Sequence, residues 1–139
     1  PRDQPRLAAA PAGDLRGPAR DAPLKLRQGI VLFAHGSRDP EWARPFKEIE
    51  RILSGKGIPV RLAYLEIMRP SLGEALADLS REVDAIRIVP VFLGYGGHIR
   101  KDLPGLVAAA RPKVKVTIDP PVGEQQDVID AIAALVARG

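Results

Sequence analysis

Three apolar runs, evenly spaced along the chain, constrain its fold more than any other feature. Each is rich in β-branched and large apolar side chains, as buried strands are, and each stops abruptly at a polar residue or a glycine-rich turn. The polar residues at these ends, His35, Glu66 and His98, lie 31 and 32 positions apart. That spacing is about the length of one strand–helix–strand unit, so it predicts that all three lie at one edge of one sheet. The runs occupy residues 29–34, 58–65 and 86–93.

The segments between the runs carry apolar residues at helical spacing. We expect helices with Pro45 in the first turn, from Pro70, after a cap at Asp102, and over residues 128–136. Residues 114–118 alternate with polar side chains and predict a fourth strand at a sheet edge. Strands alternating with helices in this way predict an α/β fold, a doubly wound four-stranded parallel sheet flanked by helices, in one domain.

Residues 1–28 differ in composition from the rest. They hold five prolines, two glycines and six alanines without apolar periodicity, so we expect a flexible arm. Residues 29–139 then form the folded domain. Six Lys/Arg against three Asp/Glu lie in the arm, whereas residues 29–139 hold 15 against 14. The folded part is nearly neutral, which argues against a nucleic-acid partner.

Other classes are excluded by what the sequence lacks. The chain has no cysteine, which removes disulfides, thiolate nucleophiles and iron–sulfur ligation and is compatible with the cytoplasm. No apolar run approaches the ~20 residues that cross a bilayer, so no membrane partner is expected.

The two histidines of the chain carry its clearest chemical signal. A single histidine in a loop is more often an ordinary loop residue than a ligand, but here both follow strands, with Glu66 between them in chain order. Imidazole nitrogens and a carboxylate oxygen are the ligands of Fe²⁺, Co²⁺, Ni²⁺ and Zn²⁺. The same groups accept protons near neutral pH.

The turns themselves match no nucleotide site. Gly94, Gly96 and Gly97 allow close approach of a ligand, but the dinucleotide and phosphate-loop patterns are absent. Ser37 has no nucleophile-elbow pattern around it and is more simply a turn residue. Nearby cations are suited to an acidic ligand, although each alone is more often solvent-facing; these are Arg38, Arg69, Arg100 and Lys101.

Three motifs resemble those of one family. Residues 34–40 read AHGSRDP, residues 65–71 read LEIMRPS, and residues 89–98 read VPVFLGYGGH, followed by DLP at 102–104. In combination and in register they resemble the short-form sirohydrochlorin chelatases of the CbiX type. The resemblance covers the chain from about Gly29 to its end.

This resemblance implies insertion of a divalent metal into sirohydrochlorin, usually Co²⁺, with Fe²⁺ or Ni²⁺ in relatives, and no organic cofactor. By position, His35 would be the catalytic proton acceptor and a metal ligand, His98 the second catalytic and metal-binding histidine, and Glu66 a contact to metal or substrate. Other substrate contacts would be Ser37, Arg38, Leu93, Gly94, Tyr95, Gly96 and Gly97. Some relatives carry a further histidine where this chain has Tyr95. Short members pair as homodimers, so the resemblance also implies a dimer.

Two alternatives remain open at this stage. The first is a non-catalytic carrier of a tetrapyrrole or metal that keeps the same fold and histidines. The second is a phosphate-handling enzyme built around residues 35–38. The residues support it less, because no phosphate cradle is evident.

Overall fold

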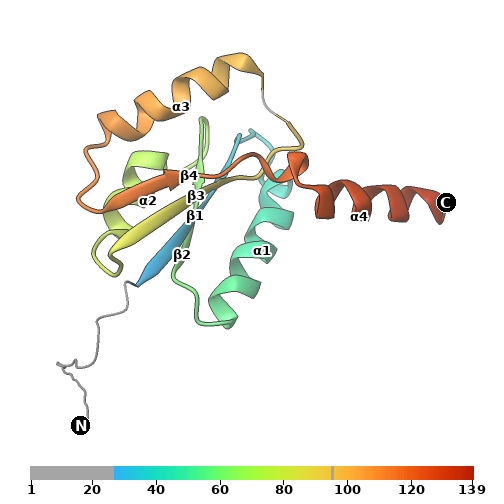
Figure 1. Cartoon of the computed structure of the whole chain (residues 1–139), viewed down its shortest axis with the longest axis horizontal. Helices are drawn as coiled ribbons and strands as arrows, with labels where there is room; N and C mark the ends of the chain where they lie inside the picture. The colour runs from blue at the N-terminus through green and yellow to red at the C-terminus, as the bar shows by residue number, and fades with distance from the viewer. Residues whose placement is uncertain (1–26, 95) are drawn as a thin grey trace, which may run out of the picture.

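The computed structural model describes residues 27–94 and 96–139. Four parallel strands form one sheet in the order β2-β1-β3-β4 (Figure 1). The predicted α/β fold, with a four-stranded parallel sheet in one domain, is confirmed. The arm predicted over residues 1–28 falls almost wholly outside the described residues, and Gln28 belongs to the first strand. The strands are β1 (Gln28–Ala34), β2 (Val60–Tyr64), β3 (Ala85–Pro90) and β4 (Lys115–Ile118).

Helices cover both faces of the sheet because the side chains of β1 alternate between two cores. Val31 and Phe33 lie in a buried cluster with residues of α2 and α3. Leu32 and Ala34 lie in a second cluster, against which α1 packs. Two short 3₁₀ helices, η1 (Pro40–Ala43) and η2 (Val122–Glu124), accompany α1 (Arg44–Gly55), α2 (Leu72–Leu79), α3 (Gly97–Ala109) and α4 (Gln126–Ala137).

The strand order creates a switch point between β1 and β3. The chain leaves β1 toward β2 on one side, and later returns to place β3 on the other side of β1. Ligands of doubly wound sheets bind outside the carboxyl ends of the strands at such a point. His35 directly follows β1 there, and the segment that leads to His98 follows β3.

The helix α2 begins with a complete capping box. Ser71 Oγ accepts from the Glu74 backbone N–H, and the Glu74 carboxylate accepts from the Ser71 N–H. The guanidinium of Arg69 also donates to this carboxylate. Its hydrogen bonds, with that of the Ser71 backbone, lower the pKa of the Glu74 carboxyl to about 2. The expected helix is thus confirmed, with its first turn just after Pro70.

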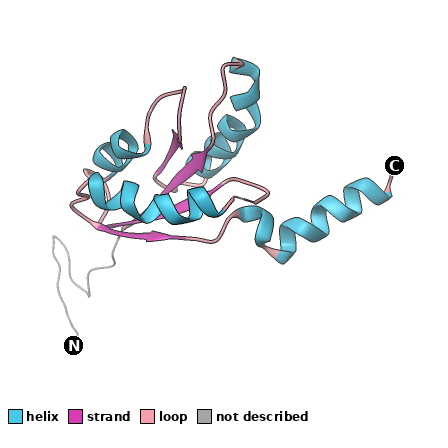
Figure 2. Ribbon diagram, turned by 90° about the horizontal axis from the view of Figure 1, so that it is seen from above, coloured by secondary structure: helices cyan, strands magenta, loops and turns pink. Residues whose placement is uncertain are grey.

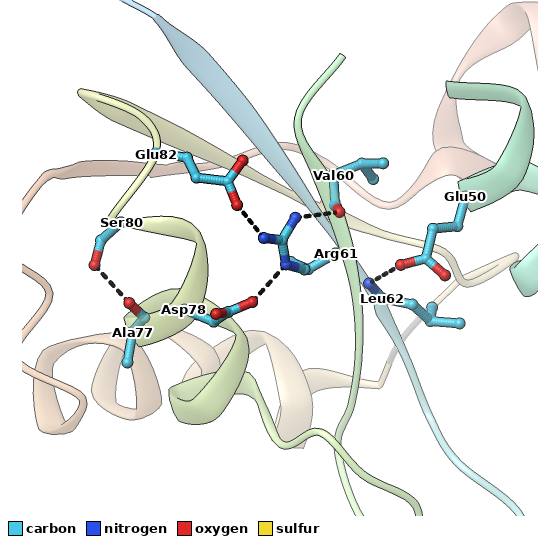
Figure 3. Close-up of polar contacts among 8 residues, drawn as sticks. All are labelled: Glu50, Val60, Arg61, Leu62, Ala77, Asp78, Ser80 and Glu82. Carbon is cyan, nitrogen blue, oxygen red and sulfur yellow. Dashed lines mark hydrogen bonds and ion pairs between the residues drawn. The ribbon is translucent and has the colours of Figure 1, made fainter. Parts of the chain in front are cut away.

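Polar contacts tie the edge strand β2 to helices on either side (Figure 3). The Arg61 guanidinium donates to Asp78 at 2.6 Å and also to Glu82, both in or just after α2. On the other side, Glu50 of α1 accepts from the Leu62 backbone N–H at 3.0 Å. This last bond occupies a backbone donor of an edge strand, which would otherwise be a site for unwanted strand pairing.

The start of α3 differs from the sequence expectation. Asp102 is not a helix cap: the helix begins at Gly97, with Gly96 in the capping position, and Asp102 and Pro104 lie inside it. Pro104 has no N–H for the usual bond to the carbonyl four residues earlier. The helix nevertheless continues, with Leu103 buried to 1% exposure against the sheet. His98 therefore lies in the first turn of a helix and not in a loop.

The last helix projects from the body of the molecule. Figures 1 and 2 show α4 running away from the sheet toward the C-terminus. None of its residues is buried, and its apolar side chains Ile129, Ile132, Leu135 and Val136 are exposed. Over residues 27–94 and 96–139, no helix is both long and apolar enough to cross a membrane.

Candidate active site

His35 and Glu66 are brought together by an extension of the β1–β2 pairing. Beyond the strand ends, the Leu65 N–H donates to the Ala34 carbonyl at 2.8 Å and the Glu66 N–H donates to the His35 carbonyl at 3.1 Å. Gly36 has a φ of 102°, and a Cβ on it would lie 2.0 Å from the Glu66 carbonyl oxygen. Only glycine fits this close approach. The loop after β1 is therefore fixed against the loop after β2.

The two side chains contact each other at the end of these loops. His35 Nε2 lies 3.3 Å from Glu66 Oε2, and both side chains are about half exposed. Phe92, which follows β3, presents its ring edge-on to the imidazole with ring centroids 6.4 Å apart. Phe92 packs in the same way on buried Phe33. The imidazole is thus held beside a carboxylate and a core-anchored aromatic ring, with one part open to solvent.

His98 forms a second histidine–carboxylate pair. Its Nε2 lies 3.1 Å from Asp102 Oδ2, one turn further along α3. The His98 side chain is 89% exposed, so it is accessible to a ligand. The i,i+4 spacing of this pair is present in the sequence, but it indicates a contact only if both residues belong to one helix that begins at Gly97. A helix that starts after a cap at Asp102, as the sequence predicts, does not contain His98 and so gives no sign of this contact.

Both pairs line one cavity of about 600 Å³. Three of the lining residues belong to the loops after β1 and β2, and six belong to α3, among them the cationic Lys101. The wall between the polar groups is partly apolar. The lining residues are His35, Leu65, Glu66, His98, Ile99, Lys101, Asp102, Gly105 and Leu106.

The predicted ligand set is brought to one cavity but not to one point. Within the described ranges, no three histidine, aspartate or glutamate side chains are grouped closely enough to hold a metal ion. The roles of His35, His98 and Glu66 as metal ligands therefore remain predictions. What the structure places together are two separate pairs, each with one imidazole and one carboxylate.

The other predicted contacts lie around the cavity and do not line it. Ser37 Oγ accepts from the Asp39 N–H at 3.1 Å and acts as a turn residue before η1. Arg38 is exposed in the same turn. Leu93, Gly94 and Gly96 are exposed between β3 and α3, Gly97 is exposed as the first residue of α3, and Tyr95 lies outside the described residues. Of the flanking cations, Arg69 pairs with Glu74 and Arg100 pairs with Glu124, whereas Lys101 lines the cavity.

Comparison with curated proteins finds a consistent set of relatives. The chain is 29% identical over 118 residues to the sirohydrochlorin cobaltochelatase of Saccharolobus solfataricus, covering 78% of this chain and 92% of that protein. It is 30% identical over 104 residues to the sirohydrochlorin cobaltochelatase of Saccharolobus islandicus, covering 74% of this chain and 79% of that one.

Solved structures show the same architecture. The CbiX protein from Marinobacter aquaeolei VT8 superposes with a TM-score of 0.71 at 28% identity, covering 80% of this chain and 95% of its own. The sirohydrochlorin chelatase SirB from Bacillus subtilis, solved in complex with cobalt, gives a TM-score of 0.69 at 19% identity, covering 81% of this chain and 51% of SirB. The family model named CbiX matches residues 29–138, which is most of the sequence and includes every residue that lines the cavity. The chain therefore belongs to the CbiX family.

Proposed function

We propose that this protein is a chelatase that inserts a divalent metal, Co²⁺ in the first place, into sirohydrochlorin. The observation that carries the proposal is the pair of histidines, each beside a carboxylate, lining one cavity at the carboxyl edge of the sheet. The names of the relatives support both the tetrapyrrole and the metal. The metal enters as a substrate, and we propose no organic cofactor.

His35 is the proposed base. Metallation exchanges two pyrrole protons for one M²⁺ ion, so two protons must leave as the ring nitrogens bind the metal. An imidazole can accept a proton near neutral pH, and the Glu66 carboxylate 3.3 Å away stabilises the imidazolium that forms. The half-exposed position of His35 leaves a route by which the proton then passes to water.

His98 is the proposed second metal-binding group. It is the more exposed of the two histidines and lies across the cavity from the loops after β1 and β2. With Glu66 it would hold the incoming ion through few protein ligands, which leaves coordination positions open for the ring nitrogens. Loose binding suits a metal that must be handed over.

The turn between β3 and α3 is the proposed seat of the macrocycle. A Cβ at Gly94, Gly96 or Gly97 would meet no atom of the described chain within 4 Å, and these glycines do not have positive φ values. Neither packing nor backbone conformation therefore requires glycine there. Room for a flat ligand against the backbone is the reason that we assign to them. Lys101 in the cavity, and Arg38 in the exposed turn after His35, would bind the peripheral carboxylates of the ring.

We also propose that the protein is a homodimer in the cytoplasm, with α4 at the subunit contact. The exposed apolar side chains of α4 lie at helical spacing on one face, and leaving such a face in water is unfavourable. SirB supports the pairing, because this chain covers only about half of SirB. Two copies would supply a comparable length of chain.

Anaerobic metallation of sirohydrochlorin by the full chain tests the function. Substoichiometric protein is mixed with metal-free sirohydrochlorin and Co²⁺, Fe²⁺ or Ni²⁺ in parallel, and the absorbance spectrum is followed. A chelatase accelerates metallation over many turnovers, with Co²⁺ used well. A protein that binds the ring stoichiometrically but does not accelerate metallation is the carrier considered above.

A further inference from the structure

The loop after β2 contains an isoleucine in a conformation that isoleucine rarely adopts. Ile67 has a φ of 71°, in the left-handed region, where the Cβ and its branches crowd the backbone. The Met68 N–H donates to the Glu66 carbonyl at 2.7 Å, which closes a three-residue γ-turn around Ile67. This form of turn is strained for any residue with a side chain.

The packing of the described chain does not explain why isoleucine occupies this position. Its side chain is 59% exposed, and neither buried cluster includes it. Glycine or asparagine would adopt the same backbone conformation with less strain. Strain that folding does not need is characteristic of residues that contact a ligand.

Ile67 is a chain neighbour of the cavity described above. It directly follows Glu66, which lines the cavity beside His35. On the far side of β1, the exposed Leu93 follows β3, and a Cβ on Gly123 would lie 1.8 Å from the Leu93 carbonyl oxygen. The backbone at Leu93 is therefore held closely by η2. Two exposed large apolar side chains thus follow the two strands that flank the His35 strand.

We infer that Ile67 is a substrate contact that, together with Leu93, binds the apolar face of the tetrapyrrole on either side of His35. The inference rests on the proposed function. It adds to the proposed substrate contacts an apolar residue, Ile67, that was not among those expected from the sequence. The γ-turn keeps the side chain exposed beside Glu66 instead of letting it pack into the core.

Binding and stability measured together test this role. Metal-free sirohydrochlorin is titrated into full-length wild type, Ile67→Asn, Ile67→Val and the control Ile52→Asn, and the melting temperature of each is recorded. Ile52 is an isoleucine of α1 with 44% exposure, and it is not among the residues that line the cavity. Ile67→Asn should weaken binding about 10-fold. Its melting temperature should stay the same or rise by about 3–8 °C, because strain is relieved.

The variants distinguish a residue that contacts sirohydrochlorin from one that stabilises the fold. Ile67→Val keeps a branched apolar side chain and should bind within about two-fold of wild type, as should Ile52→Asn. Wild-type affinity in Ile67→Asn overturns the inference while leaving the chelatase proposal intact. Weaker binding with a lower melting temperature also overturns it, because Ile67 would then support the fold. A wild-type protein that binds no sirohydrochlorin overturns the proposed function and this inference with it.

Discussion

His35 and Glu66 contact each other across the boundary between two neighbouring strands, with Nε2 and Oε2 3.3 Å apart. They are 31 residues apart in the sequence. The contact depends on backbone pairing beyond the strand ends and on Gly36, whose missing Cβ admits the Glu66 carbonyl. The base and its carboxylate are therefore positioned by main-chain geometry and not by side-chain packing alone.

Replacement of the Glu66 carboxylate should weaken metal binding during catalysis while the protein still folds. Glu66→Gln keeps the shape of the side chain but removes the charge proposed to hold the incoming ion with His98, so we expect the metal concentration for half-maximal rate to rise about 10–100-fold. Metallation rates measured over a range of Co²⁺ concentrations check this. Glu48→Gln, which changes an exposed carboxylate on α1, is the control. Identical metal dependence in Glu66→Gln and wild type would contradict the assignment.

Asp102 should act through His98. The Asp102→Asn change leaves a helix residue of similar propensity but removes the charged partner 3.1 Å from Nε2. We expect the apparent Co²⁺ affinity to fall about 10-fold, with kcat at saturating metal nearly unchanged. Asp102→Glu should recover part of the affinity. Loss of kcat without any change in metal dependence would show that the pair does not serve metal binding.

The stability of α2 should depend on pH through Glu74. Its folded pKa is lowered to about 2, first by Arg69 and then by the Ser71 backbone, so its charged form stabilises the fold. This stabilisation is complete above the ordinary carboxyl pKa and is lost as the pH falls from there toward 2. Glu74→Gln should therefore lower the melting temperature at pH 7, and the difference from wild type should vanish near pH 2. A difference that does not change with pH would disprove this contribution.

The exposed face of α4 should be needed for the dimer. Leu135→Glu places a charge on that face and should convert the protein to a monomer in size-exclusion chromatography with light scattering. Ala134→Glu is the control, because residue 134 lies on the opposite side of the helix from Ile132. A monomeric wild type, or a Leu135→Glu protein that is still dimeric, would show that α4 is not the contact.

The sequence predicted the strands of the sheet well because each strand is indicated by the pattern of apolar residues within its own short segment. The apolar runs that became β1, β2 and β3 end at the residues that reach the site, and the alternation in residues 114–118 correctly indicated an edge strand. The helix α1 ends just before Gly57, whose φ of 81° glycine adopts without strain.

The features that the sequence did not reveal depend on context. Adjacent glycines at 96 and 97 favour a turn, and Pro104 favours a helix start, so α3 was expected six residues too late. For the same reason the pairing of His98 with Asp102 could not be predicted. The strain at Ile67 has no sequence signal, because isoleucine is not a residue whose presence predicts a positive φ.

In the proposed mechanism, His35 accepts the pyrrole protons while His98 mainly binds the metal. The direct measurement is the anaerobic rate of Co²⁺ insertion into sirohydrochlorin by wild type, His35→Ala and His98→Ala over a wide range of Co²⁺, with folding confirmed by melting temperature. We expect His35→Ala to lose nearly all activity at every metal concentration. His98→Ala should recover at high Co²⁺, since mass action offsets weak ligation but cannot replace a base. Normal turnover in folded His35→Ala would show that His35 is not the base.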